Sequence, residues 1–428
     1  MSATSPPGRA ATRTGGPALV PHGWVRAGVT VLAGLVVMGA LAALGLWAAG
    51  GSDIPEGGFP RVVVAVVVVA VGGSVRLAGD AGVLAGTRAG LTVMPLSVTL
   101  AGGLVLATGF LRPLRQRAVA SGRELAGWAG RIAVLWLAAL VGLALAARQT
   151  FAVPLGTGTI GDIGSLFGIS PRIGFVTDLW PTVLFGLLWL AGVLVLALLV
   201  SRGAPLPARL LRFQESVRPA AYAMVALLLA CVALGAVVAL VAAAARGHPA
   251  ETFALVLLGL PNLVWPVLTL GMGATWHGRV DGPFGLPVPH LLDEVLRTPD
   301  ISTLNLRALA RYDGRVWWLV AVDAVLLIAA GFVLAARSPA WMRPWRHAVH
   351  MAVALVAAVL AVCLLCRVSA HYGLSLIGVG DLGGGLSGVL FLRPRPGTAL
   401  GLAMVWGLAT GFAGGLLAQG VRRRGEVP

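Results

Sequence analysis

The sequence predicts an all-α transmembrane protein, and three observations support this fold class. Apolar residues fill 58% of the 428 positions, charged residues fill only 11%, and the mean hydropathy is +0.90. Eight apolar runs are each long enough to cross a hydrocarbon layer about 30 Å thick. The arginines fall in short clusters between these runs, as topology signals do. Lipid is therefore the solvent for most of the chain.

The predicted spans begin after residues 1–22, which are rich in Ser, Thr, Pro, Gly and Arg and which we expect to be disordered. In chain order the eight apolar runs cover 28–49, 91–111, 127–147, 182–201, 220–245, 316–336, 347–368 and 397–420. Two further apolar segments are broken. Residues 62–75 give only 14 positions before the next arginine, and 252–275 is interrupted by Pro261, Asn262 and Pro266.

Arginine counts indicate how the two broken segments are placed. If neither crosses and the N-terminus is cytoplasmic, 18 arginines lie inside and 14 outside, whereas the counts reverse if both cross. The positive-inside rule therefore favours eight spans plus two broken or re-entrant helices that enter from the outer face. Lipid tolerates such segments only where protein or a wet cavity satisfies their backbone groups. We expect a plasma-membrane protein with both termini in the cytoplasm.

The order of elements is repeated along the chain. Residues 23–201 and 220–420 each contain a span, a broken helix, two spans, a Gly-rich outer loop and a final span. We expect two membrane repeats, joined by a cytoplasmic linker at 202–219 and followed by a basic cytoplasmic tail at 421–428. An even number of spans in each half makes the two repeats parallel.

Individual residues support the same duplication. At a constant offset of 219, Arg148 matches Arg367, and GDIG at 161–164 matches GDLG at 380–383. The shared GD explains most of the GVGD stretch at 378–381, which also has the form of an intramembrane aspartyl protease motif.

The two Gly-rich outer loops each hold a candidate ion pair. Arg148 precedes Asp162 by 14 residues, and Arg367 precedes Asp381 by the same distance. Glycine permits tight turns, so each loop can fold back and bring its Asp onto its own Arg. In the alternative, both arginines reach towards lipid headgroups and both aspartates cap turns.

The largest outer segment, 276–315, contains two short helical patterns, HLLDEVLR and TLNLRALARYDG. The second has Ser302 or Thr303 as its N-terminal cap and stops at Gly314. These pieces are expected to lie on the outer surface, where they either cover a cavity or fill the space between spans.

Asp323 is the only acidic residue inside one of the eight predicted spans. A charged side chain near the centre of the bilayer costs about 2.5–3.5 kcal/mol on insertion scales, so something must offset it. Asp323 is either a proton or substrate site or a structural hydrogen-bonding group that contacts a neighbouring helix.

Two catalytic patterns are weaker than they first look. An aspartyl protease needs two carboxylates that share a proton at depth, yet Asp313 and Asp381 both fall in predicted outer loops. GLSG at 385–388 has the form of a serine protease motif, but the span that follows contains no His to activate Ser387. We predict no catalytic residue.

Metal, cofactor and nucleic-acid binding are not predicted. Cys363 and Cys366 form a CxxC without a second pair, and His347 and His350 form an HxxH that is expected to anchor the chain at the cytoplasmic surface. The basic clusters lack the contiguous basic and aromatic surface that nucleic acid requires. We expect the arginines to meet anionic lipid headgroups on the cytoplasmic side.

Three stretches resemble the streptophobe family of hydrophobic multi-pass proteins from streptomycetes. They are MPLSVTLAGGLVLA at 94–107, LPNLVWPVLTLGMGATWHG at 260–278 and LARYDGRVWWL at 309–319. The resemblance implies a multi-pass membrane protein and assigns no site residue.

Two functional classes follow from these patterns. Broken segments at corresponding places in two halves are typical of a permease or a transporter of lipids or small molecules. A single intramembrane acid instead favours a membrane scaffold of the cell envelope that transports nothing. An intramembrane aspartyl protease is the remote alternative.

Overall fold

A computed structural model describes most of the chain. The described residues are 23–51, 58–80, 85–114, 122–152, 172–201, 208–246, 249–281, 302–339, 341–376 and 387–420. Within these ranges, nine helices are long and apolar enough to cross a membrane. The predicted helical transmembrane class is therefore confirmed, and the chain is an integral membrane protein.

All eight apolar runs form long helices. They are α1 (Trp24–Ala48), α3 (Leu96–Leu114), α4 (Gly122–Ala146), α6 (Leu179–Val200), α7 (Ala208–Arg246), α11 (Trp318–Arg337), α12 (Pro344–Leu365) and α13 (Pro396–Leu417). Helix α7 begins inside the stretch 202–219 that was expected to be a linker. Hydropathy marks only the apolar part of a helix, so the polar first turns of α7 escaped the prediction.

The two broken segments differ from each other. Residues 62–75 contribute to α2 (Gly58–Ala70), which has 13 residues and is too short to span alone. Residues 252–275 contribute to α8 (Pro249–Gly271), whose 23 residues make it the ninth long helix of the described chain. Gly259 of α8 has non-helical angles (φ −142°, ψ 20°), two residues before Pro261. A proline has no N–H and collides with the carbonyl four residues earlier, so the kink is expected there.

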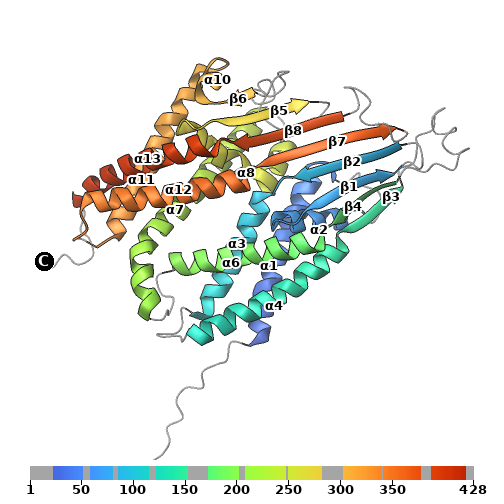
Figure 1. Ribbon diagram of the computed structural model, residues 1–428, viewed down its shortest axis with the longest axis horizontal. Helices are drawn as coiled ribbons and strands as arrows, with labels where there is room; N and C mark the ends of the chain where they lie inside the picture. The colour runs from blue at the N-terminus through green and yellow to red at the C-terminus, as the bar shows by residue number, and fades with distance from the viewer. Residues whose placement is uncertain are drawn as a thin grey trace, which may run out of the picture.

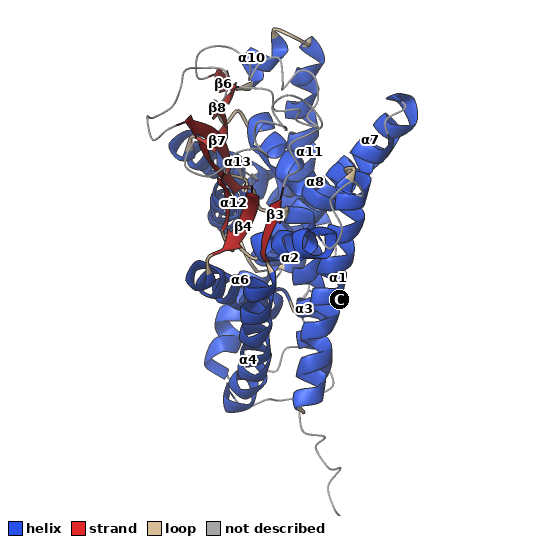
Figure 2. Cartoon of the chain, turned by 90° about the vertical axis from the view of Figure 1, so that its right-hand side faces the viewer, coloured by secondary structure: helices blue, strands red, loops and turns tan. Residues whose placement is uncertain are grey.

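The strands were not expected, and they form one antiparallel sheet of eight. They are β1 (Val75–Asp80), β2 (Ala85–Thr92), β3 (Arg148–Ala152), β4 (Arg172–Thr177), β5 (Trp276–Asp281), β6 (Ser302–Leu304), β7 (Val368–Leu376) and β8 (Ser387–Pro394). The strand order is β3-β4-β1-β2-β7-β8-β5-β6. The strands gather at one end of α4, α12 and α13 in Figure 1, and this end faces the viewer in Figure 2.

The segments expected to be outer loops supply most of these strands. β3 with β4 and β7 with β8 flank the two Gly-rich loops, and β5 and β6 come from the segment 276–315. That segment also holds the short helix α10 (Leu306–Ala310), but its cap is Asn305, whose side chain accepts from Ala308 N, rather than Ser302 or Thr303. The pattern HLLDEVLR lies outside the described residues.

The sheet repeats its own order halfway across. The strands of the first half lie in the order β3-β4-β1-β2, and those of the second half lie in the order β7-β8-β5-β6. Adding four to each strand number of the first order gives the second, so the two halves of the sheet have the same arrangement. Register matches as well. Val75 of β1 faces Thr177 of β4, and Trp276 of β5 faces Pro394 of β8; in both cases the facing residue closes a strand shortly before a long helix, α6 or α13.

The apolar core is divided between the two halves. One cluster joins α1, α2, α3, α4 and α6, and a second joins α7, α8, α11, α12 and α13; Leu96 of α3 belongs to the second, and Leu258 of α8 packs against the first. In the first, the indoles of Trp128 and Trp136 donate to the carbonyls of Phe110 (3.2 Å) and Gly186 (3.1 Å). These bonds pin α4 to α3 and to α6 at two levels.

Close packing of α12 on α13 corrects one surface prediction. His347 is fully buried rather than exposed at the cytoplasmic surface. A Cβ built on Gly411 would lie 2.7 Å from the His347 carbonyl, and one on Gly415 would lie 3.2 Å from its ring. Small residues let two membrane helices approach this closely, so His347 lies inside the helix pair.

An ion pair ties the sheet to the start of α6. Arg76 of β1 donates to Asp178, which directly precedes α6, and Ser74 Oγ donates to the same carboxylate at 3.2 Å. The Arg76 guanidinium and, less strongly, the Ser74 hydroxyl hold the pKa of Asp178 below its ordinary value, against the opposing effect of burial. The pair is largely open to solvent, since the Arg76 side chain is 72% exposed.

We therefore expect a small, pH-dependent contribution to stability. Because the folded pKa of Asp178 lies below the ordinary 3.8, the pair stabilises the fold at neutral pH and loses its effect as the pH falls below that value. A double-mutant cycle of Arg76→Gln and Asp178→Asn should give a coupling energy of about 0.2–1 kcal/mol at pH 7 and none at strongly acidic pH. Thermal unfolding in detergent measures it, and a coupling unchanged at acidic pH would contradict the assignment.

Candidate functional site

Asp323 of α11 is the buried acid around which the candidate site is built. Its side chain is only 4% exposed, and its Oδ2 has no hydrogen-bond partner among the described residues. The carboxylate packs directly on Gly271, the last residue of α8, where any Cβ would overlap it. Only glycine at that place leaves room for the acid.

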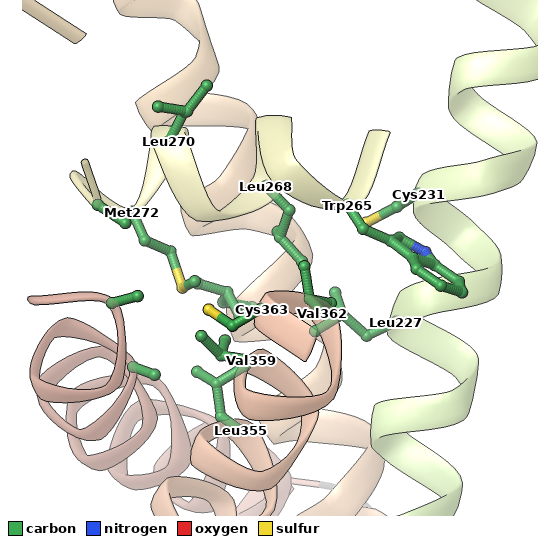
Figure 3. Close-up of a cluster of buried hydrophobic side chains, with 14 of the residues drawn as sticks. Leu227, Cys231, Trp265, Leu268, Leu270, Met272, Leu355, Val359, Val362 and Cys363 are labelled. Carbon is green, nitrogen blue, oxygen red and sulfur yellow. The ribbon is translucent and has the colours of Figure 1, made fainter. Parts of the chain in front are cut away.

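The surroundings of Asp323 are apolar. Leu327, one turn further along α11, belongs to a buried apolar cluster that also contains Cys231 of α7, Trp265 and Leu268 of α8 and Val362 of α12 (Figure 3). Burying an ionised carboxylate without a partner is costly, so such a position accommodates either a proton or a bound cation. Thiols here behave as small apolar side chains.

Helix α8 connects this acid to the first half of the chain. It packs against α1, α3, α7, α11 and α12. Beside its kink, the Ser97 hydroxyl of α3 donates to Val256 O at 2.8 Å and accepts from Leu260 N at 3.1 Å. Val256 and Leu260 are four residues apart and would bond each other in a regular helix. The serine therefore bridges the donor and the acceptor of one helical backbone bond in α8.

Asn262 makes a second polar link next to the first. Its Nδ2 donates to Met94 O at 2.8 Å, and its Oδ1 accepts from Leu96 N at 3.0 Å. Leu96 is the first residue of α3, and the N–H groups in the first turn of a helix have no partner inside the helix. Asn262 of α8 thus caps α3 from a position 166 residues further along the chain.

Three indoles fix the second half of α8. Trp265 donates to Leu228 O of α7 at 3.2 Å, Trp276 to Thr269 Oγ1 at 2.8 Å and Trp406 of α13 to Met272 O at 3.1 Å. The helix end facing Asp323 is therefore held from several sides, whereas the kink is held by Ser97 and Asn262 from α3.

The ends of α2 and α8 have the same geometry. In α2, Gly72 has φ +93° and Gly73 N donates to Val68 O at 2.9 Å. In α8, Gly273 has φ +99° and Ala274 N donates to Thr269 O at 2.9 Å. Both turns need a left-handed residue, which glycine adopts without strain.

A polar side chain of the following long helix faces each of these helix ends. Thr99 of α3 donates to Ala70 O, the last carbonyl of α2, at 2.6 Å. At the end of α8, the side chain that packs on Gly271 is the Asp323 carboxylate. The threonine is satisfied and the aspartate oxygen is not, so the two places differ in chemistry although their backbones match.

The other predicted site residues are dispersed. Arg148 opens β3, and Arg367, which precedes β7, donates from Nε to Cys363 O at 3.1 Å. Asp162 and Asp381 lie outside the described residues, so both proposed ion pairs stay predictions. Asp313 caps a short 3-10 turn by accepting from Arg315 N at 2.9 Å.

Among the described residues, no group of three or more His, Cys, Asp or Glu side chains is placed to hold a metal ion. No family model, curated protein or solved structure matches the chain. The assignment of the chain to the membrane proteins therefore rests on its helices, and the candidate site rests on the geometry of Asp323 and α8.

Sequence reasoning found part of this site. Asp323 was identified as an isolated acid in an apolar run, and Pro261, Asn262 and Pro266 as breakers of α8. Ser97 and Thr99 were missed because a hydroxyl in an apolar run gives no sign of a partner elsewhere in the chain.

Replacement of Asn262 should separate the two polar links. Asn262→Ala leaves Met94 O and Leu96 N without a partner and should lower the free energy of unfolding by about 1–3 kcal/mol. Ser97→Ala should cost less, because Val256 O and Leu260 N can then bond each other directly. Thermal unfolding of both variants in detergent tests this, and a larger loss for Ser97→Ala would contradict the geometry.

Gly271 should be intolerant of a methyl group because of Asp323. Gly271→Ala should destabilise the chain by about 1–3 kcal/mol through overpacking, and Asp323→Ala in the same chain should restore much of that loss. Gly142→Ala of α4 is the control, since a Cβ there meets nothing within 4 Å. Additive effects of Gly271→Ala and Asp323→Ala in thermal unfolding would argue against the contact.

Proposed function

We propose that the chain is a proton-coupled permease for a lipid or small molecule, built from two copies of one membrane unit. The observation that carries the proposal is the buried Asp323 carboxylate, whose Oδ2 has no hydrogen-bond partner in the described chain. Ionisable groups inside membrane segments are rare and mark ion pathways and proton relays. A purely structural acid would be expected to have a partner.

The kinked helix α8 supports a transport role for this acid. Transporter sites are formed by discontinuous helices at the boundary between repeated halves. Here α8 joins Asp323 at its C-terminal end to Ser97 near its kink. The two serine bonds can be exchanged for the regular bond between Leu260 N and Val256 O, so these two groups stay paired if the angle of the kink changes, while Pro261 keeps α8 bent. Protonation of Asp323 can thereby be coupled to the shape of α8.

Connectivity favours a re-entrant α8. A sheet cannot lie in hydrocarbon with open edges, so all the strands belong on one membrane face. Helix α6 leaves the sheet and α8 returns to it, which requires an odd number of crossings by α7 and α8 together. Helix α7, with 39 residues, crosses alone, and α8 then enters and leaves by the sheet side. The short α2 has the same placement.

The duplication is supported by three matching features. These are the strand order, the turns that end α2 and α8, and the polar side chain that faces each turn. In a duplicated chain, Thr99 and Asp323 occupy corresponding places. An acid in only one copy is then a departure from a working structural solution, which favours a functional reason for it.

The proposal includes the membrane location and the family resemblance that the sequence predicts. We place the chain in the plasma membrane with both termini in the cytoplasm and the sheet outside, in accordance with the arginine counts. The streptophobe resemblance agrees with such a multi-pass protein.

A membrane scaffold is the second candidate, and one observation favours it. The groove described below is lined by α3, α4 and α6 and does not reach Asp323. A sheet that joins both halves suits a rigid scaffold. In that case Asp323 would titrate with no solute dependence.

Two measurements on Asp323→Asn test the permease. In purified protein, the infrared C=O band of a protonated carboxyl should change with pH in the wild type and be missing in the variant. In liposomes loaded with a pH-sensitive dye, at least one solute of a panel of amino acids, sugars, peptides and lipids should drive proton entry in the wild type. The asparagine keeps the size and polarity of the side chain, so the variant should fold and lose only this coupled entry.

Proton entry that persists in Asp323→Asn would contradict the assignment of the acid. An Asp323 band with no response to any solute would favour the scaffold instead.

A further inference from the structure

An apolar groove lies on the first half of the chain, away from Asp323. Its volume is about 450 Å³, and it runs between α4 and α6 with Phe110 of α3 at one side. Ala126, Ala129 and Gly130 of α4 and Leu187 and Leu194 of α6 are among its lining residues. No residue that lines it carries a polar side chain, so the groove suits a hydrocarbon occupant.

Small side chains on α4 keep the groove open. A Cβ built on Gly130 meets nothing within 4 Å, which places open space over that residue. The two helices are pinned together at another level, where Trp136 donates to Gly186 O at 3.1 Å. The groove therefore occupies the part of α4 and α6 that lies farther from the sheet than this contact.

Basic residues stand at the same end of these helices. Arg123, in the first turn of α4, follows Gly122, which lines the groove, and its side chain is exposed. Arg112, in the last turn of α3, is also exposed. Glu124 lies on the opposite face of α4 by helical periodicity. The mouth of an apolar groove thus has positive charge beside it.

We propose that the groove binds an acyl chain of an anionic phospholipid from the leaflet farther from the sheet, with its phosphate at Arg123. Two walls of the groove are membrane helices, so acyl chains are the neighbours it meets. Walls that face an empty space lose their dispersion contacts, which an acyl chain restores. The arginine supplies the charge that selects an anionic headgroup. The site is independent of Asp323 and of the permease proposal.

A pair of glycine variants tests the acyl-chain part. Gly130→Phe fills the groove, whereas Gly127→Phe makes the same change on the exposed side of α4, outside the groove; a Cβ meets nothing within 4 Å at either position. The full chain is incubated with dioleoyl phosphatidylglycerol or dioleoyl phosphatidylcholine, and bound lipid is counted by native mass spectrometry. Gly130→Phe should lose the tightly bound phosphatidylglycerol, and Gly127→Phe should retain it.

A pair of arginine variants tests the headgroup part. Arg123→Gln should weaken phosphatidylglycerol binding about fivefold and leave phosphatidylcholine binding unchanged. Arg343→Gln, which removes an exposed arginine just before α12, is the matched control and should change neither.

Three results would overturn the proposal. The first is equal phosphatidylglycerol binding by Gly130→Phe and Gly127→Phe. The second is a wild type that binds phosphatidylcholine as tightly as phosphatidylglycerol. The third is a Gly130→Phe chain that keeps its lipid but changes its oligomeric mass, which would make the groove a contact between two copies of the chain.

Discussion

Lipid offers no hydrogen bonds, so every backbone group that a membrane helix leaves unpaired must find a partner within the protein. This constraint is most demanding where α2 and α8 end, because each helix stops against neighbouring helices. At α2 the Thr99 hydroxyl meets the last carbonyl, at 2.6 Å. At the kink of α8, Ser97 and Asn262 carry four hydrogen bonds between α8 and the start of α3. The position of the first half of the chain relative to the second therefore depends on these contacts.

The same constraint makes Asp323 exceptional. In the same half of the chain, the indoles of Trp265, Trp276 and Trp406 all donate to an acceptor. By contrast, one carboxylate oxygen of Asp323 has no hydrogen-bond partner among the described residues. Ser97 and Asn262 supply partners even at the kink of α8. A partner for Asp323, or an apolar side chain in its place, would have removed the cost of burying the acid. This unpaired oxygen is the feature on which the proposed proton-coupled role of Asp323 rests.

Sequence alone predicted the long helices because a span needs about 20 apolar residues, and that signal is local. It did not predict the sheet. The strands β2 (Ala85–Thr92) and β7 (Val368–Leu376) mix small, apolar and polar residues without a sustained alternation, and their pairing joins positions far apart in the chain. The contact of Ser97 with Val256 is equally distant. Asp323 was found because an acid in an apolar run is conspicuous, whereas its contact with Gly271 depends on how α8 and α11 pack.

The proposed duplication would explain the difference between Thr99 and Asp323 in physical terms. A single unit with a carboxylate at the helix end would have to use one side chain both to satisfy the carbonyl and to bind a proton. Two copies separate these tasks, because Thr99 can hold α2 rigidly while α8 is held elsewhere, by Trp265, Trp276 and Trp406. The indoles take over the structural role that the hydroxyl has at α2. The acid at the second helix end is thereby free to change its protonation state without removing a contact on which the fold depends.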